Sequence, residues 1–275
     1  MADRPSRRAG PARGVLHVPT PDGRTVHHRR LPGPALAPFV AHYWTVTWDL
    51  ASPFKAETLP HPSVHIVFEG QAGRQRTEVA GVHTARFTKQ LVGRGQAFGI
   101  KFRPGMFKPL WGKSLATLAN IPARAIFGAR AALWTRQTFA AETFDDQIAL
   151  SEAFLAPRLS TIPALALRVR DLAERMAVDR ALLRVEDACT AVGLDKRALQ
   201  RCFRTYVGVS PKWVMQRARL HEAAEQLKRA PRSLAALATA LGYADQAHFA
   251  RDFKRLSGCS PAAFARTRAA TTEAL

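Results

Sequence analysis

The sequence lacks the long apolar segments of a membrane protein, because none of its apolar runs approaches the roughly 18 residues of a spanning helix. Its N-terminal residues carry charge, but no apolar stretch follows them, so no secretion signal is expected either. These absences predict a cytoplasmic protein with no membrane partner.

Cysteine is scarce, and none occurs before residue 189. The three cysteines, Cys189, Cys202 and Cys259, never approach CxxC spacing, so neither a disulfide framework nor a cysteine-based metal site is expected. Reduced thiols are the default for such a chain in the cytosol. A nucleophile elbow, a phosphate loop and paired carboxylates are also missing, which predicts no enzymatic activity and no cofactor.

Acidic residues are few, with 21 Asp and Glu against 41 Lys and Arg, for a formal net charge of +20. The net charge is +5 over residues 1–30, +6 over 31–164 and +9 over 165–275. A length of 275 residues with 47% hydrophobic residues suggests two domains, each able to bury a core. The surplus of positive charge in the last third is what a polyanion-binding domain requires, although basicity alone does not establish one.

A helix-turn-helix pattern occupies the segment around Gly242. Leucine and alanine recur at helical spacing over residues 233–241, and Gly242 then ends that helix. A second helix is expected over 245–257, with Phe249, Phe253 and Leu256 on its apolar face. Two short helices joined by a glycine-containing turn are typical of this DNA-binding motif.

The motif occurs twice, because residues 193–211 repeat it about fifty residues earlier. The matched residues are Leu199, Phe203, Gly208, Ser210 and Pro211 with Phe249, Phe253, Gly258, Ser260 and Pro261. Self-similarity of this kind is a strong signal. Residues from about 165 to 268 therefore resemble the DNA-binding domain of the AraC/XylS family of bacterial transcription regulators, most specifically where the second motif is followed by Gly-x-Ser-Pro and the aromatic Phe264.

A single long helix is expected between the motifs, over residues 211–229, with Ser210 as its N-cap and Pro211 at its first position. At 1.5 Å per residue this helix is roughly 28 Å long, close to the roughly 34 Å of one turn of B-DNA. It can hold two recognition helices in successive major grooves on one face of the duplex.

The resemblance also implies which residues touch DNA. The family's base-contacting positions fall on Arg197, Gln200 and Arg201 in the first recognition helix, and on Gln246, Ala247, His248 and Arg251 in the second. Arginine can pair with guanine and glutamine with adenine. The family often has a small hydroxyl residue where this chain has Ala247. Phosphate contacts are expected from Arg204, Lys254 and Arg255.

Short strands predominate before residue 103, at about 42–48, 64–68, 77–82 and 97–102, and predict a small barrel or roll. Helices are expected afterwards at 106–111, 129–139 and 144–155. The segments LPHPS, HIVFEG and GIKFRPG resemble, more loosely, the sensor domain of one branch of the same family. A small-molecule effector is expected here, with candidate contacts at Tyr43, Trp44, Trp48, His65 and Phe102.

The expected organisation is α+β: a disordered basic arm over 1–24, a sensor or dimerisation domain over 25–156, a linker over 157–163, and an all-α DNA-binding domain over 164–270. Double-stranded DNA is the expected partner of the last domain. RNA polymerase is a further partner if the protein is an activator, and a homodimer is a candidate assembly.

One alternative for the N-terminal half is a metal-binding or enzyme-like barrel. His61, His65 and Glu69 are evenly spaced, as ligands on one face of a strand would be, and metal-binding barrels use these side chains. However, Pro60 and Pro62 flank His61, which disfavours a continuous strand through it.

Overall fold

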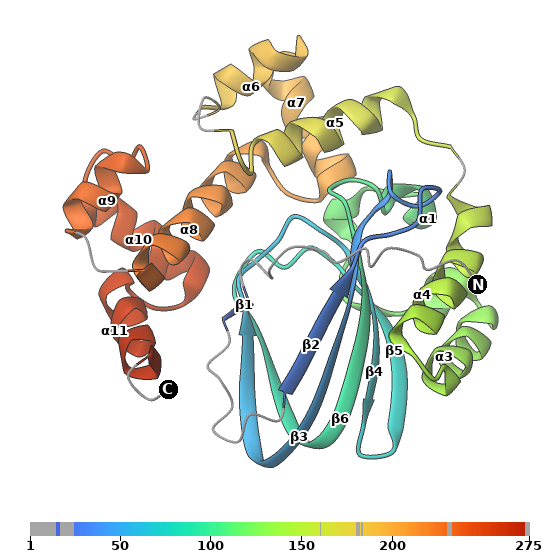
Figure 1. Cartoon of the computed structure of the whole chain (residues 1–275). Helices are drawn as coiled ribbons and strands as arrows, with labels where there is room; N and C mark the ends of the chain where they lie inside the picture. Colours follow the sequence, from blue (N-terminus) through green and yellow to red (C-terminus); the bar gives the residue numbers. More distant parts are fainter. Residues whose placement is uncertain are drawn as a thin grey trace.

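The structure, a computed structural model, describes residues 15–16, 25–159, 161–179, 182, 184–229 and 233–272. A curved sheet with helices packed against it forms the N-terminal half (residues 25–159), and helices alone form the C-terminal half (residues 161–272) (Figure 1). This α+β arrangement confirms the predicted fold class. Within the described residues, no helix has both the length and the apolar character needed to cross a membrane.

Among the described residues, seven strands form one antiparallel sheet in the order β1-β3-β6-β4-β5-β7, and β2 pairs with β3 as well. The strands are β1 (Val15–Leu16), β2 (Thr25–Arg30), β3 (Val40–Thr58), β4 (His65–Gln71), β5 (Arg74–Ala80), β6 (Phe87–Phe102) and β7 (Ile121–Pro122). Of the expected disordered arm over 1–24, only β1 is described, and it pairs with the end of β3. The described strands do not pair β2 with β7, so the sheet is an open roll and not a closed barrel.

Strands β3 and β6 are longer than the sequence predicts, with 19 and 16 residues. Their pairing shifts register between Leu50 and Phe54, and Gly93, opposite Leu50, has a φ of +54°. Irregularities of this kind bend a strand and increase its twist. Residues 51–53 (Ala-Ser-Pro) interrupt the apolar alternation. The sequence pattern therefore does not indicate that β3 continues to Thr58. The two strands therefore curve over one face of the sheet and leave it concave.

The convex face of the sheet holds the main core of the N-terminal half. Helices α3 (Arg130–Ala140) and α4 (Phe144–Leu155) cover this face (Figure 1). Its buried strand residues include Tyr43, Ile66, Phe68, Phe98, Ile100 and Phe102. Shorter elements precede these helices: α1 (Lys108–Trp111), η1 (Leu115–Thr117) and α2 (Arg124–Phe127). The helices expected at 106–111, 129–139 and 144–155 are thus confirmed, with small shifts at their ends.

The C-terminal half contains two helix-turn-helix units joined by one long helix. After the short turn η2 (Ala156–Arg158), the half begins with α5 (Ala164–Arg175). The first unit contains α6 (Val185–Val192), α7 (Lys196–Cys202) and the π-helical turn η3 (Phe203–Val207), and α8 (Pro211–Arg229) is the joining helix. The second unit contains α9 (Leu234–Ala240), α10 (Gln246–Ser257) and α11 (Pro261–Thr272). The expected 19-residue joining helix is confirmed.

Each helix-turn-helix unit has its own apolar core. In the first unit, Leu199 and Phe203 are fully buried against α5 and the start of α8. In the second, Phe249 and Phe253 pack against Leu220 of α8 and its neighbours. Leu59, which directly follows β3, also belongs to this second core and is only 2% exposed. The N-terminal half therefore completes the core of the second unit.

Candidate DNA interface and ligand cavity

The turns of the two helix-turn-helix units are built in the same way. Gly193 ends α6 and Gly242 ends α9, both with a left-handed φ, of +61° and +74°. Asp195 then accepts a hydrogen bond from the backbone N–H of Ala198 at 2.8 Å, and Asp245 accepts one from that of His248 at 2.6 Å. Aspartate satisfies an otherwise unpaired N–H group at the start of a helix. These caps set where α7 and α10 begin and so which side chains face outward.

Helix α7 presents a polar face to solvent. Its outward side chains Arg197, Gln200 and Arg201 are exposed, as is Arg204 in the following turn η3, and all four are expected to touch DNA. Within the described part of the chain, the side chains of Arg197, Gln200 and Arg201 have no hydrogen-bonding or ionic partner. The first recognition helix is therefore available to an external ligand.

Helix α10 is similar, but part of its polar face forms hydrogen bonds within the protein. Gln246, Ala247, His248, Arg251 and Lys254 are all exposed. Arg255 is exposed as well, but it donates a hydrogen bond to Asp252 at 3.0 Å. Asp252 also accepts a hydrogen bond from Gln216 of α8 at 3.0 Å. The expected contact of Arg255 with a DNA phosphate stays a prediction, as do the other expected DNA contacts.

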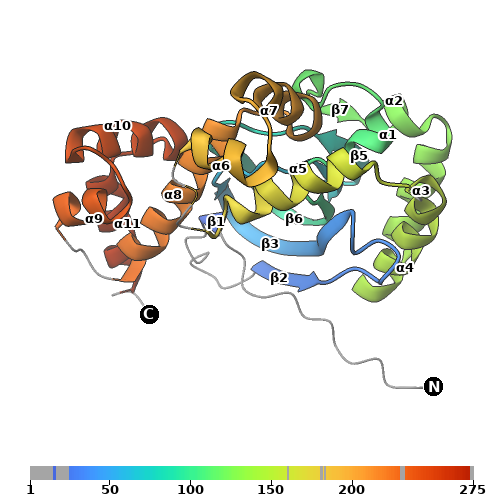
Figure 2. The same ribbon diagram turned by 90° about the horizontal axis from the view of Figure 1, so that it is seen from above.

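Helix α8 spaces the two recognition helices. It runs from the end of the first unit into the core of the second, with Leu220, Ala224 and Leu227 buried along one side. In the view from above, α7 and α10 lie toward the same side of the molecule, with α8 between them (Figure 2). The two outward faces are thus held by one rigid element.

The first unit is also docked on the N-terminal half. Turn η3 packs against η1, where the Ser114 hydroxyl donates to the backbone carbonyl of Arg204 at 3.0 Å. Gly208 lies so close that a Cβ atom there would sit 3.1 Å from the carbonyl oxygen of Leu115. Arg103 also forms a 2.7 Å ion pair with Glu174 of α5. The N-terminal half therefore contacts both helix-turn-helix units.

A cavity of about 270 Å³ lies on the concave face of the sheet. Strand register places its wall residues in successive rows across β3, β6 and β4. The first row is His42, Lys101 and His65, the second is Trp44, Gly99 and Val67, and the third is Val46, Ala97 and Glu69. Polar and cationic groups therefore gather in the first row, at one end of the cavity, and the next two rows are apolar apart from Glu69.

Glycines in β6 make room for the tryptophans of β3. A Cβ atom at Gly99 would lie 2.0 Å from Cε2 of Trp44, and one at Gly95 would lie 2.3 Å from Cζ2 of Trp48. The indole rings thus lie directly over backbone that carries no side chain. Phe54, Phe87 and Leu91 also line the cavity from the curved ends of β3 and β6.

The cationic end of the cavity meets α8. Lys101 Nζ lies 3.0 Å from His61 Nδ1, and Nη2 of Arg217, on α8, lies 2.8 Å from the same nitrogen. Arg217 Nε donates to the carbonyl of Pro60 at 3.0 Å, and His221 also contacts that carbonyl. This set of residues, the His61 cluster (Pro60, His61, Lys101, Arg217 and His221), joins the two halves of the protein.

Burial shifts the pKa values in this region. It holds the pKa of His61 and that of Lys101 well below their ordinary values, and the neighbouring cations add to both shifts. Burial, with a smaller contribution from Lys101, lowers the pKa of His65 to about 3, and burial lowers that of Arg217 to about 9. At neutral pH His61 and His65 are therefore neutral, while Arg217 keeps its charge.

The structure separates the five expected effector contacts into two groups. Trp44, Trp48 and His65 line the cavity. Tyr43 and Phe102 lie in the core on the convex face and are fully buried there, so they take no part in the cavity wall. The alternation of side chains along a strand would have separated these residues, since Trp44 and Tyr43 are neighbours and must face opposite sides.

Lys101, His61 and Arg217 were not expected at this site. One feature of the sequence indicates where Lys101 lies. It is the polar residue between the buried Ile100 and Phe102, so the alternation of side chains places it on the opposite face of the sheet. Arg217 lies within the apolar side of α8 and is only 5% exposed. His61 was considered as a metal ligand, but it precedes β4 and its neighbours are cations. In the chain as described, no three His, Cys, Asp or Glu side chains are grouped to hold a metal ion.

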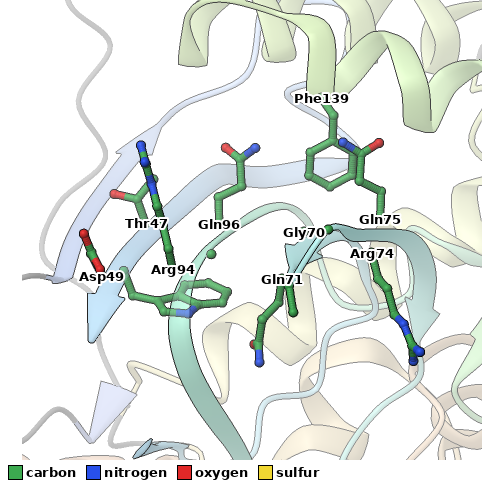
Figure 3. Close-up of a pocket in the computed structure, with 13 residues that line it drawn as sticks. Thr47, Asp49, Gly70, Gln71, Arg74, Gln75, Arg94, Gln96 and Phe139 are labelled. Carbon is green, nitrogen blue, oxygen red and sulfur yellow. The ribbon is translucent and has the colours of Figure 1, made fainter. Parts of the chain in front are cut away.

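A second, more open pocket lies at the far end of the sheet. Figure 3 shows Phe139 of α3 beside the β4–β5 turn, with Thr47, Asp49, Arg94 and Gln96 on the opposite side. Trp48 lines this pocket as well as the cavity.

Comparison with known proteins finds one family match in each half of the chain. Residues 188–267 match the family described as "Helix-turn-helix domain", and residues 28–122 match "Domain of unknown function (DUF6597)". Among curated relatives, the raffinose operon transcriptional regulatory protein RafR of Pediococcus pentosaceus is 30% identical over 83 residues, which is 30% of this chain and 30% of that protein. The HTH-type transcriptional regulator MtrA of Neisseria gonorrhoeae is 31% identical over 77 residues, or 28% of this chain and 26% of that protein.

The chain thus aligns with less than a third of the length of these relatives. Among solved structures, ToxT of Vibrio cholerae aligns over 88% of this chain and 96% of its own, with a TM-score of 0.37 and 10% identity. The repeated motif, the two capped turns and the family match agree that residues 188–267 contain a helix-turn-helix domain.

Proposed function

We propose that this protein is a transcription regulator that reads two successive major-groove segments of double-stranded DNA and responds to a small molecule bound in its N-terminal half. The observation that carries the DNA-binding part is the pair of exposed polar faces on α7 and α10, joined by α8. Each face offers arginine and glutamine side chains, which can bind base edges in the major groove.

The spacing of the two faces supports this reading. Helix α8 has 19 residues and spans roughly 28 Å, close to the roughly 34 Å of one DNA turn. The net charge of +9 over residues 165–275 supplies the attraction to phosphates that such binding needs. One chain can then contact two half-sites without a partner subunit.

The cavity supports control by an effector. It lies on the concave face of the sheet, and its cationic end contacts α8 through the His61 cluster. A ligand there can alter DNA binding only by favouring one arrangement of the two halves over another. We propose that the arrangement in question is the docking of the N-terminal half on α8 and η3.

Selection of binding sequences from random duplex DNA by the full-length protein tests the proposal. The expected result is two blocks of preferred bases about ten base pairs apart, centre to centre. Arg201→Ala should weaken preference in one block only, and Arg251→Ala in the other. A single block, or no preference over bulk DNA at moderate salt, would contradict the proposal.

A further inference from the structure

The His61 cluster holds more hydrogen-bond donors than acceptors. A lysine ammonium has three N–H groups and an arginine guanidinium five, while a neutral imidazole has a single acceptor nitrogen. Lys101 and Arg217 both approach the ring of His61: they lie 3.0 and 2.8 Å from Nδ1, and 3.4 and 2.5 Å from Nε2. Two further acceptors belong to the cluster. One is the carbonyl of Pro60, contacted by Arg217 and His221, and the other is Nδ1 of His221, 3.5 Å from Arg217 Nη2.

The cluster also lacks negative charge. Among the described residues, no carboxylate lies within ion-pair distance of Lys101 or Arg217, and the charges that act on Lys101 are those of Arg217 and Arg29. The one acidic residue in the cavity wall, Glu69, is paired with Arg76 at 3.1 Å and Lys89 at 2.8 Å. Buried charges are normally paired, because an unpaired one is costly to remove from water.

The rest of the cavity is suited to an apolar body. Trp44 and Val67 stand in the row next to Lys101, and Val46 and Ala97 follow in the row after. The volume of about 270 Å³ is at the lower end of the range for small-molecule sites. A ligand that fills this space and also reaches Lys101 needs a charged head and a short apolar chain or ring.

We propose that the cavity binds a small amphiphilic carboxylate, with its carboxylate group at Lys101 and His61 and its apolar body along Trp44 and Val67. This assignment names the effector class of the proposed function and rests on it. A carboxylate accepts several hydrogen bonds and pairs well with lysine and arginine. It supplies both the acceptor and the negative charge that the His61 cluster lacks.

The same contact links the ligand to the DNA-binding half. When the carboxylate accepts hydrogen bonds from Lys101, the acceptor nitrogen of His61 is left to Arg217 alone. The bond between His61 and Arg217 then strengthens, and with it the docking of the loop at Pro60 on α8. Bound carboxylate therefore stabilises the arrangement of the halves seen in this structure.

The test uses the full-length protein, freed of bound small molecules, and sodium hexanoate, octanoate and indole-3-acetate as probes. Each acid is compared with its own neutral amide, which has nearly the same shape. Titration calorimetry and the fluorescence of the cavity tryptophans report binding. At least one acid is expected to bind tenfold or more tightly than its amide, and the proposal is overturned if none does.

Lys101→Met locates the head group, because it removes the charge and keeps an apolar side chain. It should weaken binding of the acid at least tenfold and leave binding of the amide unchanged. Lys55→Met makes the same change at an exposed lysine outside the cavity wall and should leave both unchanged. Equal binding of the acid by Lys101→Met and wild type overturns the proposed position.

The two proposals fail in different ways. If no acid binds better than its amide but selection still yields two blocks of preferred bases, the carboxylate assignment is overturned and the DNA-binding function stands. If an acid binds but selection yields no sequence preference, the cavity is a carboxylate site in a protein whose proposed regulatory function is overturned.

Discussion

Arg217 of the joining helix donates a hydrogen bond from Nε to the backbone carbonyl of Pro60, across a distance of 3.0 Å. The two residues are 157 positions apart in the chain and belong to different halves of the protein. Because α8 also spaces the two recognition helices, this contact connects the ligand cavity to the geometry of the DNA-binding surface.

Base-reading and phosphate-binding residues on α10 should differ on mutation. Arg251→Ala is expected to cost on the order of 1–3 kcal/mol of binding free energy and to relax preference at one or two base pairs. Lys254→Ala should weaken binding to all sequences about equally and reduce the salt slope by about one unit. Binding to a panel of single-base variants at several salt concentrations measures both effects. A uniform loss for Arg251→Ala would remove it from the base readers.

Leu59 should stabilise the second helix-turn-helix unit although it belongs to the N-terminal half of the protein. Leu59→Ala leaves a cavity in that core and is expected to reduce the free energy of unfolding by about 2–3 kcal/mol. Leu133→Ala, at a leucine of α3 that is 49% exposed, is the matched control and should cost far less. Urea unfolding measures both variants. Equal losses would mean that the contact of Leu59 with α8 contributes nothing specific.

Lys101 should destabilise the ligand-free protein, since its buried charge has no acidic partner. Burial and nearby cations hold its pKa well below the ordinary value, so folding disfavours its charged form. We expect Lys101→Met to raise the free energy of unfolding by about 1–2 kcal/mol at neutral pH, as when other buried charges are replaced by apolar groups. Urea unfolding without ligand checks this value. A marked loss of stability would show that Lys101 has a structural role in the empty protein.

Stability should fall as the pH drops below about 6.5. His65 accepts a hydrogen bond from Trp44 Nε1 at 3.4 Å, and burial beside Lys101 lowers its pKa to about 3. An unfolded histidine has a pKa near 6.5. Between these values the unfolded chain binds the extra proton, so stability is fully present above pH 6.5 and is lost progressively as the pH falls toward 3.

His65→Gln should make this pH dependence shallower, because glutamine keeps an acceptor for Trp44 but does not titrate. Urea unfolding at a series of pH values between 7.5 and 4.5 compares the variant with the wild type. The same slope in both would exclude His65 as a source of the acid sensitivity. His42 and His61, whose pKa values burial also lowers, should supply the slope that remains.

The C-terminal half was predictable in detail because its signals are local. Gly193 and Gly242 end helices, Pro211 begins one, and the apolar spacing of Phe249 and Phe253 defines a buried face, all within a few residues of each other. The repeat then reinforced each signal. The extended ends of β3 and β6 were not predictable in this way, because register shifts and the Gly93 bend are specified by pairing between distant strands.

The sequence by itself determined the class of the fold, the two helix-turn-helix units and the side chains that α7 and α10 expose, because helix periodicity and capping act over a few residues. Only the tertiary structure decided that Trp44 lines a cavity while Tyr43 fills the core. It also decided that Lys101, His61 and Arg217 meet. These three residues come from a strand, a loop and a distant helix. Their contact depends on how the curved sheet docks on α8. Long-range packing sets this geometry, and no local sequence pattern predicts it.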